Sequence, residues 1–104
     1  MISSDVATVW RRVREDVDGA SWERLVLSGV RCEALRGASA SDPGPDVADG
    51  LKLYVWGCVA ISPGDRVVEG ESGDENPPAG SLRVTRVTSF SLGGRPHHME
   101  VECR

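Results

Sequence analysis

The chain has 104 residues, of which 39% are hydrophobic and 27% are charged, and its formal net charge is −4. This length and composition predict one globular domain over residues 1–104 rather than two domains or a disordered chain. The acidic balance argues against a protein that wraps nucleic acid, because that affinity comes mainly from cationic contacts to phosphate. The sequence has no apolar run of about 18 residues and no signal-peptide pattern, so we expect no membrane partner.

The N-terminal third of the chain predicts a hairpin. Residues 5–15 and 21–36 are rich in β-branched and aromatic side chains, which favour strands. The Asp18-Gly19 pair between them is a strong turn signal. The apolar residues of 5–15 also fit one face of a helix, so this alternative stays open for the first segment. Gly29 interrupts the second run and is a natural site for a bulge or bend.

A long connection and a strongly apolar segment occupy the middle of the chain. Residues 37–50 are rich in Gly, Pro and Asp, and a connection of this length is either functional or an ordinary floppy surface loop. Residues 51–60 predict a strand, with a bend at Gly57. Its first face carries Leu51, Leu53, Val55 and Val59, and its second face carries Tyr54, Trp56 and Cys58. Because both faces are apolar, we expect a loop or a neighbouring chain to cover the outer one.

The C-terminal half predicts short strands joined by turns. A turn over residues 62–65 starts with a favourably placed proline, and a short strand follows at 66–70. Residues 71–80 are acidic and rich in turn formers, so we expect an exposed, flexible loop. Alternation predicts further strands at 81–90 and 97–103.

These elements predict an all-β, mostly antiparallel fold. We expect a small β-barrel or sandwich of five to six strands. Two long loops, at residues 37–50 and 71–80, would interrupt it.

The three cysteines indicate free thiols rather than a metal site. Cys32, Cys58 and Cys103 are far apart in the sequence and form no C-x-x-C motif. We expect free, mostly buried thiols. One disulfide with one remaining free thiol is the alternative.

The adjacent histidines are the first candidates for metal or acid–base chemistry. Neighbouring residues of a regular strand point to opposite faces, so His97 and His98 are not expected to bind one ion together. The alternation groups His97 with Met99, Val101 and Cys103 on one face, and His98 with the glutamates on the other. We therefore expect one packed histidine and one solvated histidine, and no metal.

No enzyme motif is present. The sequence lacks G-x-S-x-G, the phosphate-binding glycine loops and the calcium-loop spacing. The acidic residues between Glu69 and Glu75 therefore predict a solvated loop. A Cys58–His98 pair is the remaining catalytic alternative, without local support. We expect a protein that is not an enzyme and that needs no cofactor.

The aromatic residues are candidates for a subunit interface. Tryptophan is rarely buried on all sides in a small domain and is enriched among interface hot spots. Packing in the core is the alternative. The candidate interface residues are Trp10, Trp22, Tyr54 and Trp56.

The order of three segments resembles a family of small phage and prophage minor capsid or head–tail connector proteins. The first is the return strand of the opening hairpin, residues 21–31, which reads SWERLVLSGVR. The second is residues 62–70, with the sequence SPGDRVVEG. The third pairs Val84-Thr85-Arg86-Val87 with a glycine turn and a closing strand over 97–102. The family usually has an aromatic residue where this chain has Arg31-Cys32.

The resemblance implies a head-closure, or stopper, subunit of the virion neck, assembled in the bacterial host cytoplasm. Such proteins are small β-barrels that form a homo-oligomeric ring between the portal or connector and the tail proteins and retain packaged DNA. The loop at 37–50 is then a candidate channel plug through Asp42, Asp46 and Asp49, whose charge would repel DNA that passes nearby.

Two other functions stay open. One is a tail terminator or tail-tube-like subunit of the same virion. The other is a host-encoded β-barrel binding module, which would need a deep apolar pocket with converging polar groups.

Overall fold

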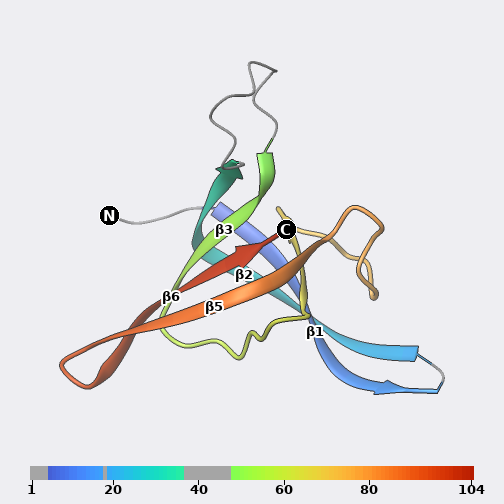
Figure 1. Cartoon of the computed structure of the whole chain (residues 1–104), viewed down its shortest axis with the longest axis horizontal. Coiled ribbons are helices and arrows are strands. Elements are labelled where there is room, and N and C mark those ends of the chain that lie inside the picture. The colour runs from blue at the N-terminus through green and yellow to red at the C-terminus, as the bar shows by residue number, and fades with distance from the viewer. Residues whose placement is uncertain (1–4, 18, 37–47) are drawn as a thin grey trace.

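The computed structural model describes residues 5–17, 19–36 and 48–104, which form six antiparallel strands. The strands are β1 (Asp5–Asp16), β2 (Gly19–Arg36), β3 (Ala48–Trp56), β4 (Arg66–Glu69), β5 (Leu82–Leu92) and β6 (Arg95–Cys103). They pair in the order β1-β2-β3-β6-β5-β4, and β4 pairs back to β1, so the sheet closes in a ring (Figure 1). The predicted all-β antiparallel fold is confirmed.

Two segment assignments change with this structure. Residues 5–15 belong to a strand, which removes the helical alternative. Strand β3 already begins at Ala48, so the predicted loop 37–50 was too long at its C-terminal end. No helix long and apolar enough to cross a membrane occurs among the residues described.

Strand β2 links the two halves of the ring. Its first part pairs with β1 as far as Val30, and its second part, from Arg31, pairs with β3. Ser28 pairs with Val6 and Val30 pairs with Asp5, so Gly29 is an extra residue in this ladder. Its φ of 68° lies in the left-handed region that favours glycine. Gly29 therefore forms the predicted bulge, at the point where β2 leaves one neighbour for the other.

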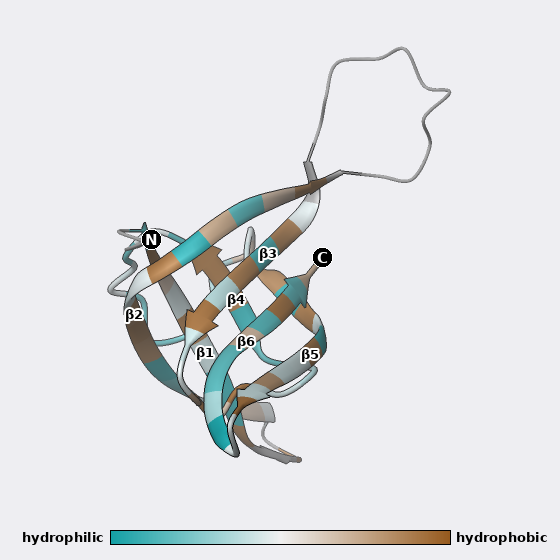
Figure 2. Cartoon of the chain, turned by 90° about the vertical axis from the view of Figure 1, so that its left-hand side faces the viewer, coloured by the Kyte–Doolittle hydropathy of each residue, from teal (hydrophilic) through white to brown (hydrophobic). Residues whose placement is uncertain are grey.

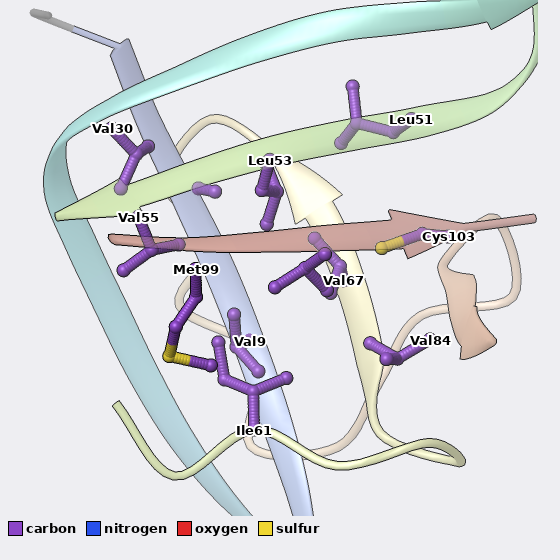
Figure 3. Packing of buried hydrophobic residues seen from close by; sticks show 12 residues of the cluster. Val9, Val30, Leu51, Leu53, Val55, Ile61, Val67, Val84, Met99 and Cys103 are labelled. Carbon is purple, nitrogen blue, oxygen red and sulfur yellow. The ribbon is translucent and has the colours of Figure 1, made fainter. Parts of the chain in front are cut away.

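The interior of the ring is filled by alternate residues of the strands. Figure 2 shows hydrophobic and hydrophilic residues alternating along β2, and Figure 3 shows inward side chains from β1, β3, β4 and β6 meeting one another. The predicted inner residues Leu51, Leu53 and Val55 of β3 and Met99, Val101 and Cys103 of β6 are confirmed as buried. His97 is exposed, and Val59 is only partly buried and lies beyond the end of β3, so the predicted strand 51–60 was too long at its C-terminal end. The core consists of Ala7, Val9, Val30, Leu51, Leu53, Val55, Ile61, Val67, Val84, Met99, Val101 and Cys103.

A buried aspartate fixes the turn before β4 to the barrel. The Asp65 N–H donates to Ser62 O, and Gly64 has a φ of 99°, as a turn with Pro63 in its second position requires. The Asp65 side chain accepts hydrogen bonds from the backbone N–H groups of Arg12 and Ser62, each at 2.9 Å. Asp65 is only 4% exposed, and these two donors satisfy its buried carboxylate.

Two hairpin arms extend beyond the ring, on different sides of the molecule (Figure 1). Strand β4 pairs with β1 only between Ala7 and Trp10, so the β1–β2 hairpin continues beyond β4 over residues 11–17 and 19–23, the first arm. Strand β3 pairs with β6 only as far as His98, so the β5–β6 hairpin continues over residues 90–98, the second arm.

Gly29→Ala tests the bend in β2. Alanine at a φ of 68° costs about 1 kcal/mol or more, so we expect a lower free energy of unfolding in urea denaturation. Gly73→Ala is the matched control, because no atom lies within 4 Å of its added Cβ and its φ is outside the left-handed region. Equal unfolding midpoints for the two variants would show that the bulge needs no glycine.

Candidate functional site

Residues 71–80 cover the outer face of β1. The Thr8 hydroxyl donates to Gly70 O at 2.7 Å and accepts from the Ser72 N–H at 2.9 Å. Arg24 Nη1 donates to Ser72 O at 3.0 Å. The first half of this segment is therefore anchored to β1 and β2, and most of its residues are exposed, as expected.

Trp10 lies beneath this segment. Its indole Nε1 donates to Asp74 O at 2.9 Å, and the side chain is 0% exposed. Val9 points into the core, so Trp10 lies on the opposite, outer face of β1, where residues 71–80 cover it. The prediction of Trp10 as a subunit-interface residue is wrong, because this chain buries it with its own loop.

The other three aromatic candidates remain partly accessible, but they do not form one cluster. Trp22, on the first arm, borders a hollow of about 350 Å³ together with Pro77 and Pro78. Tyr54 and Trp56 lie two residues apart on the outer face of β3, and Trp56 is 47% exposed. The surface therefore offers two separate aromatic regions.

Of the three candidate plug aspartates, only Asp49 lies among the residues described. Asp49 belongs to β3, so its assignment to the loop is wrong. Asp42 and Asp46 lie outside the described residues.

The two histidines lie on the same side of the sheet because of a bulge. Phe90 pairs with His98 and Ser91 pairs with Pro96, so His97 is an extra residue on β6. The Nδ1 atoms of His97 and His98 are 2.8 Å apart. The expectation that these side chains point to opposite faces is wrong, since it assumed a regular strand, and a bulge re-aims a side chain. His97 is accordingly exposed rather than part of the inner face.

Aromatic rings surround this histidine pair. Phe90 stacks on the His98 ring, with centroids 4.6 Å apart and an interplanar angle of 5°. Trp56 lies on the neighbouring strand, 5.8 Å from the His98 ring and 6.1 Å from the His97 ring. His98 Nε2 lies 3.3 Å from Glu100 Oε2. We call Trp56, Phe90, His97, His98 and Glu100 the histidine cluster.

An ion pair continues the histidine cluster along β3. Lys52 Nζ lies 2.7 Å from Glu100 Oε1 and 5.2 Å from the Tyr54 ring centroid. The hydrogen bond to Lys52, helped by the one to His98, lowers the pKa of Glu100 below its usual 4.5. The hydrogen bond to Glu100 raises the pKa of Lys52 above 10.5. Both groups are therefore charged across the neutral range.

The described residues contain no group of three His, Cys, Asp or Glu side chains placed to hold a metal ion. The hydrogen bonds of the His98 ring go to His97 and Glu100, and neither involves Cys58. Nothing in this geometry therefore supports the Cys58–His98 pair as a catalytic dyad.

All three cysteines are free thiols, as expected, but only one is exposed. Cys58 lies at the surface, whereas Cys103 is buried and Cys32 is half-buried. Burial, followed by the charges of Glu69 and Asp5, raises the pKa of Cys32 to about 11. Burial is also the main cause that raises the pKa of Cys103 to about 12.

Alkylation should distinguish the three thiols. At pH 8 we expect iodoacetamide to modify Cys58 in the folded protein while Cys32 and Cys103 react far more slowly, since roughly a thousandth or less of each is thiolate. Peptide mass spectrometry measures the three rates, and all three sites should react in urea. Equal rates in the native protein would contradict the burial of Cys32 and Cys103.

Acid should weaken the Lys52–Glu100 contribution to stability. Because the pKa of Glu100 is lowered in the folded state, this contribution is complete above about 4.5 and is lost as pH falls through the lowered value. In Lys52→Met, we expect an NMR titration to place the Glu100 pKa closer to 4.5. Arg86→Met, which removes the partner of Glu102 at 3.9 Å, should leave the Glu100 pKa unchanged.

No family model, no curated protein and no solved structure matches this chain.

Proposed function

We propose that this chain is a structural subunit of a tailed-phage neck, in which its copies form a head-closure ring between the portal or connector and the tail and retain packaged DNA. Two things support this function. The first is the order of the three sequence segments that resemble phage minor capsid and connector proteins. The second is the distribution of exposed apolar side chains, which carries the proposal.

The exposed large apolar side chains gather at the two arms. Val13 and Val17 lie on the first arm, 62% and 101% exposed, and Val26 lies next to its base. Phe90 and Leu92 lie on the second arm, and Trp56 flanks its base. Single exposed apolar residues are common on protein surfaces. Two groups of exposed apolar side chains, one at each projecting hairpin, are typical of surfaces that bind another protein.

Two different apolar surfaces on one chain favour head-to-tail assembly. A heterologous contact joins one surface of a copy to a different surface of the next copy, and it produces a ring when the rotation closes. The arms extend to different sides of the molecule (Figure 1), so a head-to-tail ring would join the second arm of each copy to the first arm of the next. A stable interface buries about 800 Å² on each partner, which is more than these few side chains provide. The contact must therefore also include other residues along the arms.

The charge of the chain agrees with DNA that passes without being bound. The net charge is −4, and Glu71, Asp74 and Glu75 are exposed on the segment that covers β1. Acidic groups repel phosphate, so DNA beside such a ring would not be held tightly.

A tail-terminator ring would use the same arms. The position in the virion separates the two functions: a head-closure subunit binds the connector, and a terminator binds the end of the tail tube.

Charge substitutions on each arm test the ring. We expect purified chain to join a ring on the connector of the same virion, measured by light scattering and negative-stain microscopy. Val17→Asp and Leu92→Asp should each reduce ring formation at least tenfold, because each buries a charge in one surface of the interface. Ala60→Asp, an exposed position outside both arms, is the control and should assemble normally.

Mixing the two arm variants distinguishes head-to-tail contact from a symmetric contact. A Val17→Asp copy keeps an intact second arm, and a Leu92→Asp copy keeps an intact first arm. In the mixture, the intact second arm of a Val17→Asp copy should bind the intact first arm of a Leu92→Asp copy. The two remaining arms of this pair both carry a charge, so assembly should stop at the dimer. A wild-type chain that stays monomeric with the connector, or arm variants that assemble like wild type, would overturn the proposal.

A further inference from the structure

We propose that His97 and His98 form a chelating site for a divalent transition-metal ion at the base of the second arm. The inference rests on the bulge in β6 and does not depend on the function proposed above. Without the bulge at His97, adjacent side chains would point to opposite faces. With it, two imidazole nitrogens lie 2.8 Å apart on one side of the sheet.

Glu100 orients one of the two rings. Its Oε2 lies 3.3 Å from His98 Nε2, and a carboxylate at that distance accepts the proton that Nε2 carries. In the tautomer that carries this proton on Nε2, His98 has a lone pair on Nδ1, the nitrogen that faces His97. A carboxylate behind a ligating histidine is the usual arrangement that fixes its tautomer.

The distance between the two nitrogens indicates which coordination angle, and so which metal ions, the site fits. Two imidazole nitrogens at about 2.0 to 2.1 Å from a metal ion are about 2.8 to 3.0 Å apart at a right angle, and about 3.4 Å apart at a tetrahedral angle. The observed 2.8 Å is a hydrogen-bond distance, in which one Nδ1 carries a proton, and it is close to the right-angle spacing that an ion would need after displacing that proton. This geometry favours Cu²⁺ or Ni²⁺, which take square-planar or octahedral positions, over tetrahedral Zn²⁺.

The surroundings hold the rings in place and leave the ion accessible. Phe90 stacks on His98, and Trp56 contacts both imidazoles, so the rings lose little freedom when an ion binds. His97 is exposed, so solvent reaches the site. On binding, His97 carries its proton on Nε2, and the two rings rotate slightly so that both Nδ1 lone pairs converge on the ion.

The site has two side-chain ligands and no third among the residues described. Water therefore completes the coordination, and the affinity should be modest. The chain has only these two histidines, so an imidazole-bound ion in untagged protein can lie only at this site.

The experiment uses untagged protein in a Cys58→Ser background, which removes the exposed thiol as a competing ligand. Calorimetry with Ni²⁺ measures affinity and stoichiometry, and electron paramagnetic resonance with Cu²⁺ counts the coordinated nitrogens. We expect one ion per chain and two equivalent nitrogens at neutral pH. Binding should weaken in acid, because a protonated imidazole has no free lone pair.

The variants separate chelation from incidental binding. His97→Ala and His98→Ala should each lower the Ni²⁺ affinity at least tenfold and leave one nitrogen on Cu²⁺. Glu100→Gln should lower the affinity about 10-fold to 100-fold while keeping two nitrogens. Glu33→Gln, an exposed carboxylate on β2, should have no effect.

Three outcomes would overturn the proposal. They are a wild-type Cu²⁺ spectrum with fewer than two nitrogens, an affinity equal to that of the double variant His97→Ala, His98→Ala, and tighter binding of Zn²⁺ than of Ni²⁺ and Cu²⁺. Circular dichroism of each variant shows whether the β structure is retained, so a loss of binding is not mistaken for unfolding.

Discussion

The closed sheet is built around its longest strand, β2, which is bent at Gly29. Strand β2 pairs with β1 along its first part and with β3 along its second, and the change of partner takes place around Gly29. The first residue of β1, Asp5, pairs with Val30, and from Arg31 onward β2 pairs with β3 instead. The extra residue in the left-handed region bends the chain at this point. All the inward side chains of Figure 3 then face a common interior.

A second bulge, at His97, acts on the surface instead of the core. The register between β5 and β6 shifts by one residue between Phe90 and Ser91. Because the side-chain period of a strand is two, this shift decides which face a residue occupies. Met99, Val101 and Cys103 keep their inward direction, and His97 moves to the side of His98. The inserted residue, His97, thus lies between the part of β6 that faces the core, from Met99 onward, and the part that belongs to the second arm.

The outer face of the barrel is covered unevenly. Residues 71–80 bury Trp10 and Thr8 through hydrogen bonds, and Lys52 and Glu100 give the outer face of β3 a polar pair beside Tyr54. Residues 71–80 reach only Trp22 of the first arm, and in the part of the chain that the structure describes the arms carry the exposed side chains of Val13, Val17, Phe90 and Leu92. An interface is therefore best sought at the arms, where apolar area is still exposed to water.

The sequence by itself determined most of the strands and the inner faces of β3 and of β6 from Met99 onward, and it left a helix open for residues 5–15. Alternation of apolar residues is a local property, so the burial of Leu53 and Val101 follows from it. A glycine within a strand is also a local signal, and it indicated the bulge at Gly29. The directions of Trp10 and His97 were decided only by the tertiary structure. Trp10 is buried by a segment more than sixty residues away in the sequence, through a bond to the backbone of Asp74, and no local pattern encodes that contact. His97 changes face because of its register against β5, and register depends on how two strands pair rather than on either strand alone.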